Sequence, residues 1–249
     1  MYYQNEIKIG YTDCDEKDRM KLSAAMRCMQ QSSSEHLEAL NLPAARLFAE
    51  NMVFLLVKMC IRVHHMPVCR QPIVVGTAPV GIRGVRFLRE FTMESLAGER
   101  LLSALSLWVL ADPRTHKILR PASFPYHLEL HDSRLDGVIG DIPMPRQLGE
   151  GEQTRTDVQI RYSHLDVNRH VNNSFYGDFV CDALPYHALV AQGIETVAIN
   201  FQNEARWGET LEITTHSLGE REYYIRGLHG ASACFDAYAT LGNAGADIK

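Results

Sequence analysis

The feature that most constrains this chain is a polar stretch that occurs twice, 151 positions apart. Each copy follows a short alternating strand and leads into an apolar helical pattern. The identical residues are Tyr11 with Tyr162, Asp15 with Asp166, and Ser23 with Ser174. A repeat at a fixed offset indicates a duplicated unit, so the chain should fold as two copies of one strand–loop–helix plan.

The first half reads as one short strand, one long helix and four more strands. Ile7 and Ile9 share one face of the opening strand. Apolar periodicity predicts a helix over about residues 23–40, and a short second helix over 44–50 starts after Pro43, a residue favoured at helix starts. Strand patterns follow at residues 53–63, 73–78, 85–93 and 101–110.

The second half repeats the plan, so we predict an α+β protein of two tandem β-α-β-β-β-β units. A strand reaches Tyr162, and the helix after the polar stretch runs to about Leu184, where Pro185 ends it. Four strand patterns follow at residues 197–201, 211–215, 223–227 and 231–241.

A stretch rich in Gly and Pro, residues 136–155, lies between the two halves. We interpret it as a linker that wraps the surface. It divides the chain into an N-terminal unit of residues 1–135 and a C-terminal unit of residues 156–249. The 249 residues, 46% of them hydrophobic, suffice for one large core or two small ones.

The second copy of the polar stretch concentrates chemically useful side chains. Asp166, Asn168, His170 and Asn172 fall within seven positions, with no Gly or Pro between them. One interpretation is a polar loop that caps the following helix, because Asp and Asn are common in turns. The other is a functional loop, since a strand-to-helix connection on a rigid scaffold presents side chains to a ligand. The helix N-terminus would add free N–H groups and partial positive charge there.

The segment LDVNRHVNNSFY, residues 165–176, resembles the signature loop of acyl-ACP thioesterases, which release fatty acids from acyl carrier protein (ACP). The matches are Leu165, Asp166, Asn168, His170, Val171, Asn172, Asn173 and Tyr176. Shorter versions of the loop occur in single hot-dog acyl-CoA thioesterases. The resemblance implies a double hot-dog fold, in which each half wraps a curved antiparallel sheet around a long helix. It also implies hydrolysis of acyl-ACP to free fatty acid, the step that terminates fatty acid synthesis.

A second motif follows the catalytic helix at residues 201–209. Glu204 matches a glutamate of the family, and Ala205 stands where plant-type members carry a cysteine. Strand alternation places Glu204 on the polar face with Asn200 and Gln202. The alternative is that Glu204 is an exposed strand residue that pairs with a nearby arginine. Without a cysteine at position 205, the chemistry would fall to carboxylates.

The resemblance implies a catalytic set of Asp166, Asn168, His170 and Glu204, with no metal and no cofactor. Thioester hydrolysis needs a base or nucleophile and a donor to the oxyanion. We expect Asp166 or Glu204 to act as the base or nucleophile and Asn168 to donate to the oxyanion. His170 would orient a carboxylate or water. The choice between the two carboxylates stays open at this point.

The first copy of the loop has lost these residues. Lys17 stands where the second copy has Asn168, and Arg19 stands where it has His170. We therefore predict that the N-terminal loop is catalytically silent. The N-terminal half, rich in Leu, Met and Phe, is predicted to form the wall of the acyl-chain pocket.

Composition narrows the remaining function classes. A net charge of −5 and a pI near 6.1 argue against a nucleic-acid partner. No apolar run is long enough for a membrane span, the start does not resemble a signal peptide, and the six cysteines are scattered. We expect a cytoplasmic monomer or homodimer that takes acyl-ACP and its fatty acyl chain.

Two alternatives to acyl-ACP hydrolysis remain: an acyl-CoA thioesterase of the same fold, and a non-catalytic acyl-binding protein. A basic patch for the acidic carrier protein would favour acyl-ACP hydrolysis over acyl-CoA hydrolysis. The candidate residues for such a patch are Arg134, Arg146, Arg155, Arg161, Arg169 and Arg206.

Overall fold

The computed structural model describes residues 2–135 and 153–243. In the N-terminal half these form β1 (Tyr3–Lys8), α1 (Leu22–Ala39), α2 (Ala44–Ala49), β2 (Val53–Val63), β3 (Pro72–Arg83), β4 (Arg86–Ser95) and β5 (Arg100–Ala111). In the C-terminal half they form β6 (Gln153–Gln159), α3 (Phe175–Ala183), α4 (Tyr186–Gln192), β7 (Ile194–Phe201), β8 (Thr210–Ser217), β9 (Glu222–His229) and β10 (Ser232–Leu241). The predicted strands and helices are all present, with ends that move by a few residues.

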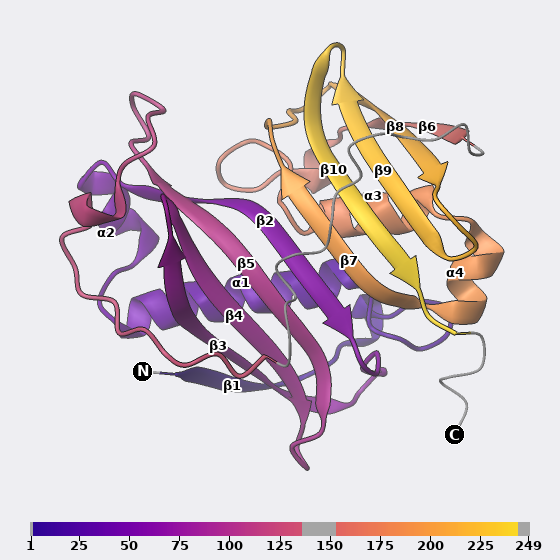
Figure 1. Cartoon of the computed structure of the whole chain (residues 1–249), viewed down its shortest axis with the longest axis horizontal. Helices are drawn as coiled ribbons and strands as arrows, with labels where there is room; N and C mark the ends of the chain where they lie inside the picture. Colours follow the sequence, from indigo (N-terminus) through magenta and orange to yellow (C-terminus); the bar gives the residue numbers. More distant parts are fainter. Residues whose placement is uncertain (1, 136–152, 244–249) are drawn as a thin grey trace.

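The described strands pair into one 10-stranded antiparallel sheet, in the order β1-β3-β4-β5-β2-β7-β10-β9-β8-β6 (Figure 1). The order in the first five strands is repeated in reverse in the last five, so the two halves are related by a pseudo-two-fold axis. The halves meet where β2 pairs with β7, from Lys58 opposite Asn200 to Arg62 opposite Thr196. This arrangement confirms the predicted double hot-dog fold.

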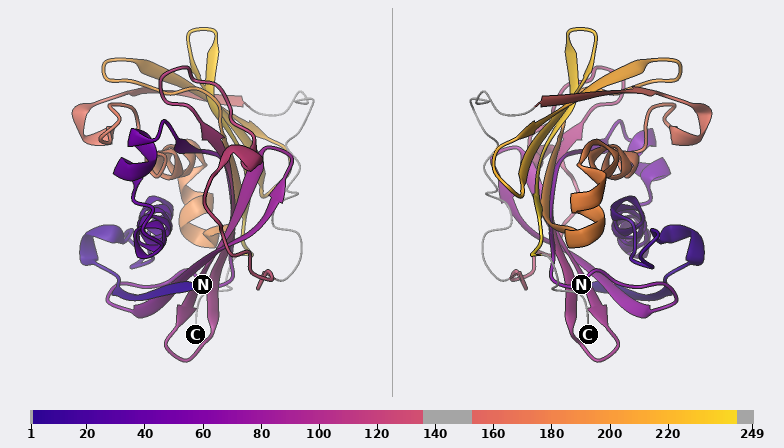
Figure 2. Two further views of the ribbon diagram at one scale, coloured as in Figure 1. Left: turned by 90° about the vertical axis from the view of Figure 1, so that its left-hand side faces the viewer. Right: turned by 90° about the vertical axis from the view of Figure 1, so that its right-hand side faces the viewer.

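The helices lie on one side of the curved sheet (Figure 2). Apolar residues at helical spacing on α1, including Ala25, Met26 and Met29, are fully buried against the sheet. On α3, Phe179 and Val180 enter the same core. The helices α1 and α3 pack beside each other, and each also lies across a hollow from the other half's loop. None of the helices in the described residues is long and apolar enough to span a membrane.

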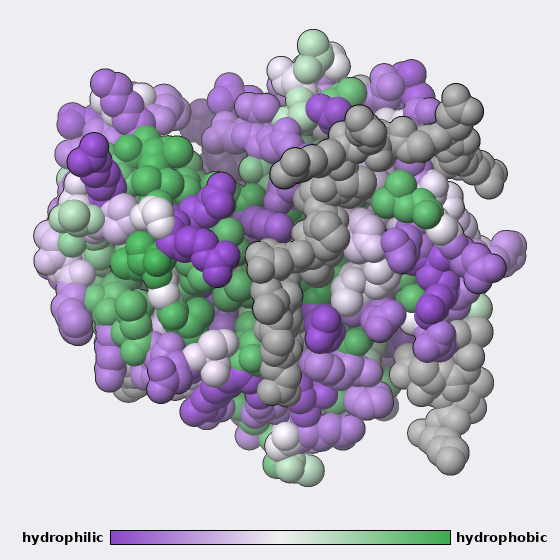
Figure 3. Space-filling view, in the orientation of Figure 1, coloured by the Kyte–Doolittle hydropathy of each residue, from purple (hydrophilic) through white to green (hydrophobic). Residues whose placement is uncertain are grey.

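A second apolar cluster lies on the helix side of the sheet in the N-terminal half, where it also includes Leu37 of α1 and Leu47 of α2. Phe54, Phe87 and Trp108 pack there beneath Leu119 and Phe124 of the segment that follows β5. The segment after β5 therefore shields the sheet from water. Figure 3 looks onto the opposite face of the sheet and shows that hydrophobic side chains also gather there, over the N-terminal half.

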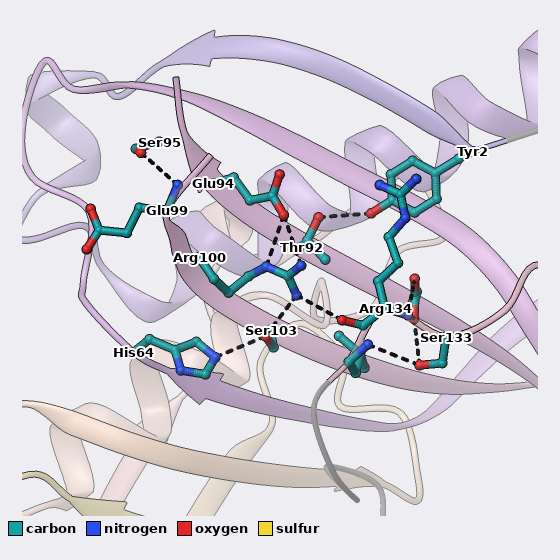
Figure 4. A network of polar contacts seen from close by, with 12 residues as sticks. Tyr2, His64, Thr92, Glu94, Ser95, Glu99, Arg100, Ser103, Ser133 and Arg134 are labelled. Carbon is teal, nitrogen blue, oxygen red and sulfur yellow. Dashed lines mark hydrogen bonds and ion pairs between the residues drawn. The ribbon is translucent and has the colours of Figure 1, made fainter. Parts of the chain in front are cut away.

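The end of this segment is fastened by polar contacts around a buried carboxylate on β4 (Figure 4). Glu90 accepts hydrogen bonds from Ser133 Oγ at 2.9 Å and from the Arg134 backbone N–H at 3.0 Å. The Arg134 guanidinium lies 3.9 Å from the centre of the Tyr2 ring. Glu90 faces away from α1, because the preceding residue, Arg89, bonds to His36 on that helix. Arg134 is thus held on the outer face of the sheet.

Two elements differ from the sequence prediction. Helix α4 was not predicted, although Pro185 both ends α3 and precedes the first residue of α4, where proline is well tolerated. Strand β6 starts at Gln153, inside the stretch assigned to the linker. The prediction missed this start because the first residues of this edge strand are exposed and show no apolar alternation. The rest of the predicted linker, 136–152, lies outside the described residues.

Candidate active site

The second polar loop folds back on itself between β6 and α3. A single 3₁₀ turn, Tyr162–His164, is followed by a bridge between Leu165 and Val171. Within the loop, the Asp166 N–H donates to the His170 carbonyl at 3.0 Å. Arg169 adopts φ 67°, a left-handed conformation that closes the turn.

The first loop forms the same backbone hydrogen bonds at corresponding positions, which supports the duplication. Its 3₁₀ turn covers Tyr11–Asp13. The Asp15 N–H donates to the Arg19 carbonyl at 2.8 Å, and Asp18 adopts φ 60°. The two loops therefore share one backbone design and differ in their side chains.

Glu204 reaches the loop through the backbone and not through strand alternation. β7 ends at Phe201, so Glu204 lies in the connection beyond it, and the predicted placement on the polar strand face is wrong. The Val171 N–H donates to the Ala205 carbonyl at 2.9 Å, and His170 forms a bridge with Arg206. This short ladder fastens the Glu204 segment to the loop.

His170 lies between two carboxylates. Its Nδ1 is 3.7 Å from Asp166 Oδ1, and its Nε2 is 3.5 Å from Glu204 Oε1. The exposed fractions of the side chains are 26% for His170, 21% for Asp166 and 49% for Glu204. Arg206 contacts the second Glu204 oxygen at 3.2 Å. Glu204 is therefore the most exposed of the three side chains, and Asp166 is the least exposed.

Asp166 also shapes the turn on which Asn168 stands. Asp166 Oδ1 accepts the Asn168 backbone N–H at 2.8 Å, and Oδ2 accepts the Asn168 side-chain amide at 3.4 Å. In the first loop, Asp15 Oδ1 accepts the Lys17 N–H at the same 2.8 Å. Because the first copy, which lacks the asparagine and the histidine, keeps this bond, the aspartate has an architectural role that does not depend on those residues.

The helix N-terminus offers less to an oxyanion than the sequence suggested. The Ser174 N–H donates to Asn172 Oδ1, and the Phe175 N–H donates to the Asn172 carbonyl, both at 2.9 Å. These two N–H groups are satisfied within the loop. The exposed Asn168 amide is therefore the better placed donor.

Tyr176 supports the site from below, and sequence reasoning gave it no role there. It is almost fully buried on α3, and its ring packs edge-on against Phe179, Phe201 and Phe235. Its hydroxyl hydrogen-bonds to the backbone of Ala205, although burial dominates and raises the Tyr176 pKa. Tyr176 thus ties helix α3 to the segment that carries Glu204.

An open hollow of about 1060 Å³ lies between the loop and α1 of the other half. Its wall on the α1 side is made by Arg27, Gln30, Gln31 and Ser34. Asp166 and Asn168 line the opposite wall. The hollow is large enough for a thioester with part of its carrier arm.

Neither a metal nor a thiol is suggested at this position. Across residues 2–135 and 153–243, His, Cys, Asp and Glu nowhere form a group of three or more suited to a metal ion. Position 205 is a fully buried alanine. Burial raises the pKa of the Cys28 thiol to about 11 and also raises that of Cys234, so both disfavour the reactive thiolate.

Comparison with known proteins matches each half of the chain to a domain of the same protein family. Residues 1–122 match the acyl-ACP thioesterase N-terminal domain, and residues 149–233 match the acyl-ACP thioesterase C-terminal domain. The acyl-[acyl-carrier-protein] hydrolase FATB2 of Cuphea viscosissima is 24% identical over 208 residues, 78% of this chain and 50% of that protein. The chain spans about half the length of the curated relatives it matches.

Two solved structures share the fold over nearly the whole chain. An acyl-ACP thioesterase from Bacteroides thetaiotaomicron is 16% identical, with a TM-score of 0.85 over 96% of this chain and 97% of that one. The 12:0-ACP thioesterase from Umbellularia californica is 17% identical, with a TM-score of 0.80 over 96% of each chain. With both of its halves matched in sequence and its double hot-dog fold shared, this chain belongs to the acyl-ACP thioesterase family.

Proposed function

We propose that the protein hydrolyses the thioester of acyl-ACP and releases a free fatty acid, ending acyl-chain synthesis on the carrier. The observation that carries this proposal is the position of His170 between Asp166 and Glu204, in a loop whose Asp166 and Asn168 line an open hollow. Membership of the family supports the substrate class.

The silent copy indicates how the roles divide. The Met20 N–H donates to the Pro67 carbonyl, as the Val171 N–H donates to the Ala205 carbonyl, so Met66 is the counterpart of Glu204. The first loop therefore keeps the aspartate and lacks the asparagine, the histidine and the glutamate. We assign the chemistry to Asn168, His170 and Glu204, and we assign Asp166 to holding the turn and orienting the imidazole.

In this mechanism Glu204, directly or through His170, removes a proton from a water molecule as the water oxygen attacks the thioester carbon. The carbonyl oxygen becomes an oxyanion and accepts a hydrogen bond from the Asn168 side-chain amide. When the tetrahedral intermediate collapses, the C–S bond breaks. The proton held by Glu204 and His170 passes to the departing sulfur, and the products are a carboxylic acid and the carrier thiol.

The N-terminal half supplies the other wall of the hollow through α1. We propose that residues 1–135 accommodate the acyl chain and take no part in bond cleavage, while residues 156–249 carry the catalytic groups. We also propose the cytoplasm as the compartment, because the six cysteines form no disulfide within the described chain.

A thiol-release assay with purified protein tests the function. Acyl-ACP and acyl-CoA of several chain lengths would be compared at equal concentration, with His170→Ala as the inactive control. We expect acyl-ACP to be turned over with the higher kcat/KM and the His170 variant to lose on the order of a hundredfold or more. Faster turnover of acyl-CoA would favour the acyl-CoA thioesterase alternative, and binding of acyl chains without thiol release would favour the non-catalytic one.

A further inference from the structure

The surface around the catalytic loop exposes large apolar side chains that the fold does not use. Val167, between Asp166 and Asn168, is 96% exposed, and Trp207 is 70% exposed. Both lie beside the reacting groups, because the bridge between His170 and Arg206 joins the two segments. A branched side chain and an indole held in water next to a catalytic loop are typical of a protein-binding surface.

The silent copy provides an internal comparison for these positions. The counterpart of Val167 is Glu16, whose carboxylate accepts a hydrogen bond from the Tyr186 hydroxyl at 2.9 Å. The counterpart of Trp207 is Cys69, which is only partly exposed. The silent copy therefore has no large apolar side chain standing in solvent at either place. The exposure of Val167 and Trp207 is thus specific to the second copy, whereas Tyr162 and its counterpart Tyr11 are exposed in both.

Two arginines flank the same side chains. Arg161 and Arg169 are exposed and form no ion pair with any residue that the structure describes. The silent copy has Gly10 and Asp18 at these positions. It does carry exposed cations elsewhere, so the distinguishing feature is the combination of unpaired arginine with exposed apolar groups, a composition enriched at protein interfaces.

The larger basic patch expected from sequence is divided by the fold. Arg134 is held over Tyr2 on the outer face of the sheet. Arg155 pairs with Glu212 at 2.7 Å, and Arg206 pairs with Glu204. Arg146 lies outside the described residues. What remains is a surface that we call the catalytic rim: Arg161, Tyr162, Val167, Arg169 and Trp207. Tyr162, Val167 and Arg169 line the hollow, and Arg161 and Trp207 lie next to each other where the Gly208 N–H donates to the Ile160 carbonyl.

We propose that the catalytic rim is the docking surface for the acyl carrier, an acidic protein that delivers the thioester into the adjacent hollow. The inference rests on the proposed function and adds the place of contact. Charge complementarity selects this occupant, because Arg161 and Arg169 present local positive charge on a chain of net charge −5. The apolar rim residues supply the contact area that a small nucleotide carrier does not require.

The test exchanges rim residues for their counterparts in the silent copy. Val167→Glu with Arg169→Asp introduces side chains that the first loop already holds in the same backbone conformation, so the loop should fold. Hydrolysis would be measured with acyl-ACP, acyl-CoA and an acyl-N-acetylcysteamine thioester of equal chain length. We expect kcat/KM for acyl-ACP to fall at least tenfold through KM, with the N-acetylcysteamine rate within about threefold of wild type.

Two further variants keep the test decisive. Trp207→Ala lies off the loop and should lower kcat/KM for acyl-ACP selectively, by several-fold. The reverse exchange, Glu16→Val with Asp18→Arg, alters the silent loop and should leave all three substrates unaffected. Increasing ionic strength should weaken acyl-ACP hydrolysis by wild type more than by the rim double variant.

Several outcomes would overturn the proposal. Equal losses on all three substrates would show that the rim residues act on the chemistry. An equal loss on acyl-CoA would show that they contact the carrier arm and not a carrier protein. A wild-type dimer that Val167→Glu converts to monomers would assign the rim to a second copy of the chain. Absence of thiol release from every substrate by wild type would instead refute the proposed function itself.

Discussion

Replacement of Asn168 by alanine isolates the proposed oxyanion donor. The backbone N–H of residue 168 would still donate to Asp166 Oδ1, because that 2.8 Å bond does not involve the Asn168 side chain. Among the residues that the structure describes, the one side-chain hydrogen bond lost is the exposed contact with Asp166 Oδ2 at 3.4 Å, worth at most about 1 kcal/mol of folding free energy. Loss of one oxyanion donor typically lowers kcat by about 10²–10³-fold, or about 2.7–4 kcal/mol of barrier.

We therefore expect Asn168→Ala to lower kcat on acyl-ACP at least a hundredfold with a Tm within about 3 °C of wild type. The measurement is steady-state thiol release together with thermal unfolding. Lys17→Ala is the matched control, because Lys17 occupies the same place in the silent loop and its N–H makes the same bond to Asp15. Its kcat should stay within tenfold of wild type. An equal loss in both variants, or a loss below tenfold in Asn168→Ala, would refute the assignment of the donor.

Three further predictions concern the carboxylates, the thiols and the pH range. Glu204→Gln should lower kcat at least a hundredfold and Asp166→Asn by only about tenfold, since Glu204 accepts the proton and Asp166 orients the His170 imidazole. If steady-state kinetics gave the larger loss for Asp166→Asn, Asp166 would be the base. Iodoacetamide should leave turnover largely intact, and inactivation that substrate prevents would point instead to a cysteine. Burial lowers the pKa of His164, whose Nδ1 accepts the Arg161 N–H, so the folded state binds fewer protons than the unfolded state as pH falls below about 6.5. Tm measured from pH 8 to pH 5 should therefore fall more in wild type than in His164→Gln.

The sequence was sufficient for the architecture because the information is local and repeated. The apolar spacing of α1 and the alternation of β2 and β7 are properties of short segments, and the second half confirms the plan of the first. The start of strand β6 was placed too late, inside the predicted linker, because the strand lies at the edge of the sheet with almost no buried side chain. Helix α4 escaped detection because a proline that ends one helix also permits the next to begin.

The site was only partly predictable, for a different reason. Asp166, Asn168 and His170 lie in one loop, so a motif can identify them together. Glu204 joins them through a ladder between the loop and the segment after β7, a tertiary contact that has no local signature. The strand alternation used to place Glu204 does not extend beyond Phe201, where β7 ends. Its presence in the site followed from the family resemblance and not from that alternation.

The two loops together show which part of the motif builds the turn, and they support our assignment of the chemistry to the remaining residues. In both, an aspartate accepts the N–H two residues later, and its own N–H donates to the carbonyl four residues later. Removing this aspartate would open the turn, so either copy needs it whether or not it reacts. Asparagine and histidine form no comparable backbone bond, and in the first loop a lysine and an arginine replace them without altering the turn. Arg19 even pairs with Asp15 at 3.0 Å, near where His170 lies beside Asp166. A surviving aspartate in such a loop therefore indicates the backbone design, whereas asparagine, histidine and the distant glutamate together indicate a catalytic copy.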